Sequence, residues 1–155
     1  MRHKKAPKLN IQPDPKFSRT DIAKFINYLM YGGKKSTAAR VMYDALERIA
    51  ESSKQDPLQV FDEAIKNVSP LLEVRSRRVG GANYQIPFPV RTERRFFLAA
   101  KWLIGASRAR KGATMAVKLA DEIMQAAKGE GAAVKKRADV HRMAEANKAF
   151  AHFAR

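Results

Sequence analysis

Residues 71–90 read LLEVRSRRVGGANYQIPFPV and interrupt the helical pattern of the rest of the chain. Their apolar residues alternate with polar residues or with proline, which is the two-residue period of a β-strand. Gly80 and Gly81, near the middle, supply the positive φ angles that a hairpin turn needs. These residues predict a two-stranded β-ribbon over residues 71–91.

Pro87 and Pro89 determine which edge of this ribbon is paired. Successive strand residues point their N–H groups to opposite sides, so prolines two residues apart lack donors along the same edge. This edge therefore faces away from the partner strand, and a third strand cannot pair well there. Two-stranded ribbons are marginal in water, so we expect this one to rest on neighbouring helices or on a ligand.

Apolar residues on both sides of the ribbon recur at the spacing of an amphipathic helix. The stripes predict three helices within residues 17–70 and three more within residues 92–150. Asp56 followed by Pro57 signals the start of the third helix, and Thr92 is the expected cap of the fourth. The residues of the sixth helix that are expected to face inward are Val140, Met143, Ala144 and Asn147.

The first 16 residues differ from the rest because they are basic, hold three prolines and contain few large apolar side chains. We interpret residues 1–16 as an extended basic arm that a partner orders. The predicted fold is mainly α: a bundle of about six helices, with a projecting two-stranded β-ribbon inserted between the third and fourth helices. The length of 155 residues predicts a single domain over residues 1–155.

The charge of the chain points to a polyanionic partner. Lysine and arginine total 31 against 15 aspartates and glutamates, a formal net charge of +16. Cysteine is absent, which excludes disulfides, cysteine nucleophiles and thiolate zinc sites. The most apolar stretch, residues 96–106, is shorter than the roughly 20 residues that a membrane span needs and contains Lys101. We therefore expect a soluble intracellular protein with no membrane partner.

Catalytic motifs have little support in this sequence. The three histidines, at 3, 141 and 152, form no metal-binding arrangement, and no serine elbow or Walker loop is present. Residues 32–36, GGKKS, resemble only the end of a phosphate-binding loop and join two helices, where such a loop follows a strand. We predict no enzyme, catalytic residue, metal or cofactor; a phosphotransfer enzyme with a nucleotide at residues 34–36 is the alternative.

Arginines flank the predicted ribbon. Guanidinium groups bind phosphates bidentately and stack on bases in ways that lysine cannot, and Tyr84 adds a stacking surface near the turn. A solvated charge run is the alternative interpretation. The arginines of the first strand are Arg75, Arg77 and Arg78, and those that follow the second strand are Arg91, Arg94 and Arg95.

Further basic clusters lie in the arm, between helices or near helix ends, where phosphate contacts are common. Together they predict a surface that follows folded RNA, although each cluster alone is more often solvated than bound. A helix-turn-helix reader of DNA is the alternative, but several scattered patches fit an irregular RNA better. These residues are Lys4, Lys5, Lys8, Lys34, Lys35, Arg108, Arg110, Lys111, Lys135, Lys136, Arg137 and Arg142.

Several long motifs make the chain similar to a known family. The motifs are GKKSTA (33–38), NVSP (67–70), EVRSRRVGG (73–81), YQIP (84–87), AVKKR (133–137) and HRMAEANKAFAH (141–152). Together they resemble the S-seven family of small-subunit ribosomal proteins, in its bacterial form. The resemblance extends over nearly the whole chain, with one departure at Phe153, where many relatives have a tyrosine.

The resemblance implies a structural, non-enzymatic protein of the cytoplasmic ribosome. It implies a primary binder of the 3′ major domain of the small-subunit rRNA, one that organises assembly of the head. Implied partners are neighbouring head and platform proteins, the exit-site tRNA and the mRNA; members in some bacteria also bind their own mRNA as repressors. The residues implied to lie near tRNA and mRNA are Arg78, Val79, Gly80, Gly81, Ala82, Asn83, Tyr84 and His152.

Overall fold

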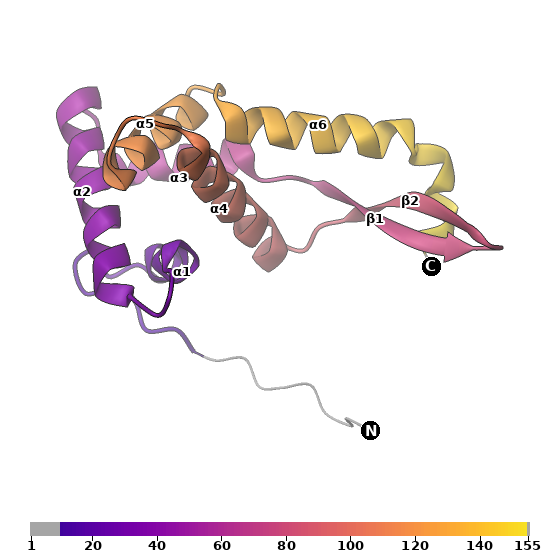
Figure 1. Cartoon of the computed structure of the whole chain (residues 1–155), viewed down its shortest axis with the longest axis horizontal. Helices are drawn as coiled ribbons and strands as arrows, with labels where there is room; N and C mark the ends of the chain where they lie inside the picture. The colour runs from indigo at the N-terminus through magenta and orange to yellow at the C-terminus, as the bar shows by residue number, and fades with distance from the viewer. Residues whose placement is uncertain (1–9, 155) are drawn as a thin grey trace. The chain divides into compact units, whose positions relative to one another are not determined.

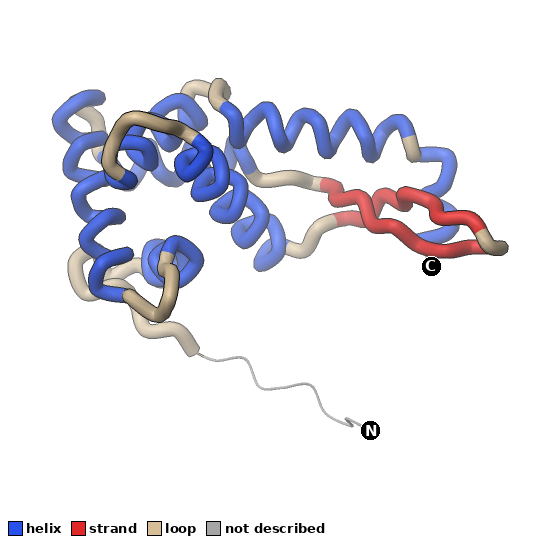
Figure 2. The backbone as a smooth tube through the Cα atoms, in the orientation of Figure 1, coloured by secondary structure: helices blue, strands red, loops and turns tan. Residues whose placement is uncertain are grey.

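A computed structural model describes residues 10–154, which form six α-helices, one 3-10 helix and one two-stranded sheet (Figures 1 and 2). The elements are α1 (Thr20–Leu29), α2 (Lys35–Ser53), α3 (Pro57–Val68), β1 (Leu72–Val79), β2 (Ala82–Pro89), α4 (Thr92–Ala109), α5 (Met115–Ala127), α6 (Ala132–Ala146) and η1 (Lys148–Ala154). The predicted mainly α fold, with its ribbon between the third and fourth helices, is confirmed. Most of the predicted basic arm, with Lys4, Lys5 and Lys8, lies outside the described residues.

The chain divides into two compact units, residues 1–40 and 41–155, and the division falls within α2. In the first unit, α1 buries the apolar stripe that contains Ile22 and Phe25. The turn before α1 is organised by Asp14, whose carboxylate accepts hydrogen bonds from the backbone N–H groups of Lys16 (3.0 Å) and Phe17 (3.1 Å). This Asx-type turn sets the direction in which the chain enters the helix.

Two helix starts in the second unit test the predicted caps. The Asp56 side chain accepts a hydrogen bond from the Leu58 N–H at 3.0 Å, with Pro57 at the first position of α3, as predicted. The predicted cap at Thr92 is wrong by one residue. Thr92 is already helical, and Arg91 occupies the cap position without a side-chain hydrogen bond. Arg91 has the extended backbone angles that are usual at a cap position.

Helices α3, α4, α5 and α6 pack against one another in the second unit. Their apolar stripes form its core, because burying one face of each helix removes that face from water. The half-buried Trp102 and Phe97 border this core. The core residues of these helices are Val60, Phe61, Ala64, Val68, Leu98, Ala99, Ala100, Leu103, Ile104, Leu119, Ala120, Ile123, Ala126, Ala133 and Ala144.

A carboxylate is buried within this core. The Glu122 side chain is 0% exposed, and one of its oxygens accepts the backbone N–H of Ala133, at the start of α6, at 3.0 Å. The other oxygen accepts the Arg110 Nε–H, also at 3.0 Å. A buried carboxylate needs both a counter-charge and hydrogen bonds. Glu122 therefore joins α5 to the end of α4 and to the start of α6.

The ribbon has the predicted pairing. Strands β1 and β2 are antiparallel, and Val79 lies opposite Ala82 across a turn in which Gly80 and Gly81 have φ angles of 56° and 91°. Pro87 and Pro89 lie opposite Val74 and Leu72, in non-hydrogen-bonded pairs, where a backbone N–H would point outward and proline has none. The adjacent pair, Leu71 with Val90, is hydrogen-bonded, since the N–H of Val90 donates to the carbonyl of Leu71 at 3.0 Å. Hydrogen-bonded and non-hydrogen-bonded pairs alternate along an antiparallel ladder, which places both prolines in the non-hydrogen-bonded kind.

The C-terminal region supports the ribbon from outside the helical core. Helix α6 contacts both strands, and η1 contacts β2, so the end of the chain lies along the ribbon (Figures 1 and 2). The prediction that Met143 faces inward is wrong, since its side chain is 50% exposed, whereas Ala144 is buried as predicted. The buried residues of α6 are Ala133 and Ala144, so only small side chains of this helix pack fully against its neighbours. Within residues 10–154, no helix is long and apolar enough to span a bilayer.

Candidate nucleic-acid interface

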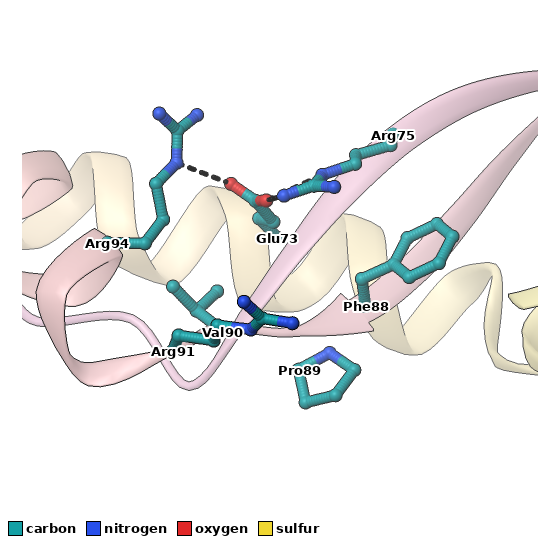
Figure 3. Close-up of a pocket in the computed structure, with 7 residues that line it drawn as sticks. All are labelled: Glu73, Arg75, Phe88, Pro89, Val90, Arg91 and Arg94. Atoms are coloured by element: carbon teal, nitrogen blue, oxygen red, sulfur yellow. Dashed lines mark hydrogen bonds and ion pairs between the residues drawn. The ribbon is translucent and has the colours of Figure 1, made fainter. Parts of the chain in front are cut away.

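A hollow of about 600 Å³ lies at the base of the ribbon, where β2 leads into α4 (Figure 3). Three arginines line it, together with one carboxylate and a small apolar surface. They converge because β1, the end of β2 and the first turn of α4 meet at this point. The lining residues are Glu73, Arg75, Phe88, Pro89, Val90, Arg91 and Arg94.

Glu73 connects two of these arginines. Its Oε1 accepts a hydrogen bond from Arg75 Nε at 2.6 Å, and its Oε2 accepts one from Arg94 Nε at 3.2 Å (Figure 3). Burial opposes ionisation of Glu73, but the hydrogen bonds and charges of Arg75 and Arg94 outweigh it and hold the pKa of this carboxyl below its ordinary value. Glu73 is therefore ionised at neutral pH, and the hollow carries a net positive charge.

Aromatic rings lie beneath both of these guanidinium groups. Arg75 lies 5.5 Å from the ring centre of Phe88, and Arg94 lies 5.0 Å from that of Phe97. Such cation–π contacts restrain the planar groups without using their N–H donors. Arg91, the third arginine of the hollow, is exposed and makes no side-chain hydrogen bond or ion pair with any described residue.

Several predicted RNA-binding cations have partners within the protein. Arg110 pairs with the buried Glu122, and Arg137 Nη1 donates to the carbonyl of Asn67 at 2.6 Å, at the end of α3. Arg95 Nε donates to the carbonyl of Val90 at 3.0 Å. These three arginines stabilise junctions between elements, and a sequence shows only their charge.

Other predicted cations are exposed and have no side-chain partner among residues 10–154. Their charges are balanced by solvent and counterions, which a polyphosphate displaces on binding. Arg108 is also exposed, and Arg142 makes one loose ion pair with Asp139 at 3.7 Å. The unpartnered cations are Lys34, Lys35, Arg78, Arg91, Lys111, Lys135 and Lys136.

Tyr31 was not among the predicted site residues. Its side chain is 84% exposed, on the turn between α1 and α2, where its carbonyl accepts the Lys34 N–H at 3.2 Å. An exposed ring beside two unpartnered lysines, Lys34 and Lys35, has the composition of a base-stacking surface. The sequence does contain a signal for this exposed ring. Tyr31 follows the last residue of an apolar helical stripe and directly precedes Gly32 and Gly33, so its side chain is not part of the buried face of the helix.

The tip of the ribbon and the end of the chain are brought together. The Tyr84 ring lies 5.0 Å from the ring of Phe150 and 5.8 Å from that of Phe153, and Arg77 Nη1 donates to the Phe153 carbonyl at 2.7 Å. Tyr84, predicted as a stacking surface for RNA, thus packs against two aromatic rings of the protein, in tilted contacts. Residues 78–83 extend beyond this aromatic cluster, and His152 is exposed beside it.

His141 joins α6 to the start of the ribbon. Its Nε2 accepts a hydrogen bond from the Leu71 backbone N–H at 3.0 Å, so the ring is neutral when this bond exists. Burial and the positive charge of Arg137 lower the pKa of His141 below its ordinary value. No group of three histidine, aspartate or glutamate side chains within the described residues is arranged to hold a metal ion.

A helical protein with an arginine-lined ribbon and a large surplus of cations belongs to the class that binds structured RNA. A family model described as "Ribosomal protein S7p/S5e" matches residues 1–148. The small ribosomal subunit proteins uS7 of Chromohalobacter salexigens and Paraburkholderia phymatum are each 55% identical to the chain over 152 residues, which is 98% of this chain and 97% of theirs. The chain belongs to the ribosomal protein S7p/S5e family.

Membership confirms the family resemblance and its bacterial form. The chain is a structural protein of the small ribosomal subunit, in the cytoplasmic ribosome of bacteria, and it is not an enzyme. Its partners are the small-subunit rRNA and other ribosomal proteins. The phosphotransfer and DNA-regulator alternatives are thereby set aside.

Proposed function

We propose that the chain binds the 3′ major domain of the small-subunit rRNA as a primary binder and organises assembly of the head. The observation that carries this proposal is the set of exposed, unpartnered cations together with the arginines of the hollow. Folded RNA presents phosphates from several helices, and separate cationic patches neutralise them at once. Because these cations occur in both units, we also propose that residues 1–155 act as one RNA-binding domain.

Three of the cations with internal partners have a different role in this proposal. Arg110, Arg137 and Arg95 hold the helices and the ribbon base in place. Arg91, Arg78 and the lysines contact phosphate. Tyr31 stacks on an unpaired base beside phosphates held by Lys34 and Lys35, which adds shape recognition to charge.

A salt titration tests the proposal. The full chain and a transcript of the 3′ major domain are mixed, and log K is plotted against log[salt]. We expect a steep line, with a slope of roughly −0.7 to −0.9 for each phosphate neutralised. A structured RNA of equal length from another rRNA domain is the control, and it should bind more weakly at every salt concentration. Affinity that does not change with salt, or equal affinity for both RNAs, contradicts the proposal.

We also propose that residues 78–84 and His152 lie near the exit-site tRNA and the mRNA. Support comes from the packing of η1 against β2, which makes the ribbon tip and the end of the chain one surface, with Arg78 exposed on it. A photo-crosslinking amino acid at position 78 in assembled subunits should give a product with exit-site tRNA. The same amino acid at position 48, on α2, is the control. A product with rRNA alone from position 78 contradicts this placement.

A further inference from the structure

An acid occupies the hollow that is proposed to receive RNA phosphate. Of the described residues that line the hollow, Glu73 is the one acid, against three arginines. It is 8% exposed. A negative charge at this place repels phosphate, so by charge alone a neutral residue would bind RNA more tightly.

The geometry gives Glu73 a role that offsets this repulsion. Its two oxygens take hydrogen bonds from guanidinium groups on different elements, Arg75 on β1 and Arg94 on α4 (Figure 3). Each guanidinium keeps N–H groups that no described residue uses, because Arg94 bonds Glu73 only through Nε and Arg75 only through Nε and one Nη. Figure 3 shows the two Nη atoms of Arg94 directed away from Glu73.

The rings of Phe88 and Phe97 restrain the same two side chains from below. Arginine loses much rotamer freedom when it is immobilised, and this loss weakens binding if it happens only when the ligand arrives. Here a carboxylate and two rings already hold the guanidinium groups in the free protein. Most of this conformational entropy is therefore lost on folding, and less is lost when RNA binds.

We propose that Glu73 is a positioning residue, which holds Arg75 and Arg94 on two sides of the hollow so that RNA backbone phosphates meet two fixed guanidinium groups. This inference rests on the proposed function of the hollow in rRNA binding. It adds that the spacing of these two groups is set by the protein before RNA binds.

Two variants with the same change of charge test it. Glu73→Gln and Asp139→Asn each remove one negative charge, and Asp139 pairs only loosely with Arg142, away from the hollow. If charge alone matters, both variants bind the 3′ major domain transcript more tightly and to the same degree. Positioning predicts that Glu73→Gln binds about tenfold more weakly than Asp139→Asn, the scale of coupling within one ion-pair network. Equal or tighter binding by Glu73→Gln overturns the inference.

A second measurement does not depend on how well the variant folds. Arginine side-chain NMR of the free, unaltered protein should show resolved, slowly exchanging Nε–H signals for Arg75 and Arg94; averaged signals overturn the inference. The variants Arg75→Ala and Arg94→Ala test whether the hollow binds RNA at all, independently of the positioning role of Glu73. If neither weakens RNA binding, the proposed role of the hollow is wrong. If both do and Glu73→Gln does not, only the positioning role is wrong.

Discussion

His141 and Leu71 are 70 residues apart in sequence, and a 3.0 Å hydrogen bond from the Leu71 backbone N–H to the imidazole Nε2 joins them. The bond fixes the start of β1 to α6. It requires a neutral ring, because a protonated imidazole has no acceptor. The charged neighbours of this ring are Arg137, one turn earlier on α6, and Glu145 and Lys148, which line the same groove.

The free energy of unfolding should therefore decrease as the pH is lowered below the ordinary pKa of histidine. The folded-state pKa of His141 lies below the ordinary value of about 6.5, so the unfolded chain binds more protons between the two pKa values. The contribution of His141 is fully present above this ordinary value and is lost as pH falls below it. Thermal unfolding and exchange of the Leu71 amide, measured from about pH 7.5 down to about pH 5.5, check this prediction. The variant His141→Gln is the control and should flatten the dependence; an unchanged profile contradicts it.

Arg110 and Lys111 are adjacent and carry the same charge, but their substitution by alanine should have different effects. Arg110→Ala leaves the buried Glu122 without its counter-charge, so we expect a loss of about 3 kcal/mol in the free energy of unfolding. Lys111 is exposed and has no partner among the described residues, so Lys111→Ala should change this free energy by no more than about 0.5 kcal/mol. Urea unfolding measures both, and equal losses refute the distinction.

The unpartnered arginines should act on RNA binding and not on stability. Arg78→Ala and Arg91→Ala each remove an exposed guanidinium, so the slope of log K against log[salt] should become shallower by roughly 0.7 to 0.9 for each phosphate that the variant no longer neutralises. Arg48→Ala removes another exposed arginine, one on α2 that is not predicted to contact RNA. A slope that changes as much for Arg48→Ala would show that general charge, and not these positions, determines binding.

Two glycines should respond to alanine in opposite ways. Gly131 has a φ of 94°, and a Cβ there would lie 3.0 Å from Glu122 Oε1. Gly131→Ala should therefore destabilise the protein by about 1 kcal/mol or more, through backbone strain and displacement of the carboxylate. Gly105 lies within α4 with open space around it, so Gly105→Ala should raise stability by about 0.5–1 kcal/mol. Melting temperatures should move in opposite directions, and a shared direction disproves the argument.

The aromatic cluster of Tyr84, Phe150 and Phe153 should stabilise the ribbon locally. Phe150→Ala removes a ring 5.0 Å from Tyr84, which costs about 0.5–1.5 kcal/mol beyond the lost burial. Amide exchange should accelerate in β1 and β2 but not in α3 and α5. Tyr84→Phe keeps the ring and is the control, for which we expect unchanged exchange. Acceleration spread evenly over the molecule would count against a local role.

The regular features of the fold could be predicted from the sequence because each is local. The alternation of apolar residues in 71–90 predicts the two strands, and the Gly80–Gly81 pair predicts the turn through its positive φ angles. Asp56 and Pro57 start α3 for the same reason. In contrast, the position of Met143 depends on which neighbours α6 contacts, and a helical stripe does not specify them.

The candidate site was predicted less completely. Charge counts identified the arginines, but not that Arg110 is paired with a buried acid 12 residues later or that Tyr84 packs against the end of the chain. Such partners are set by tertiary packing. The folded chain therefore shows which cations are held at junctions between elements, as Arg110, Arg137 and Arg95 are, and which keep N–H donors exposed.

The prolines of β2 have a consequence for the protein before it reaches the ribosome. A free ribbon edge is a template on which another chain can add a strand and begin an aggregate. Pro87 and Pro89 remove the outward N–H donors from that edge, where the ribbon leaves the helices. A newly synthesised molecule waiting for its RNA thus has the base of one ribbon edge poorly suited to intermolecular sheet growth.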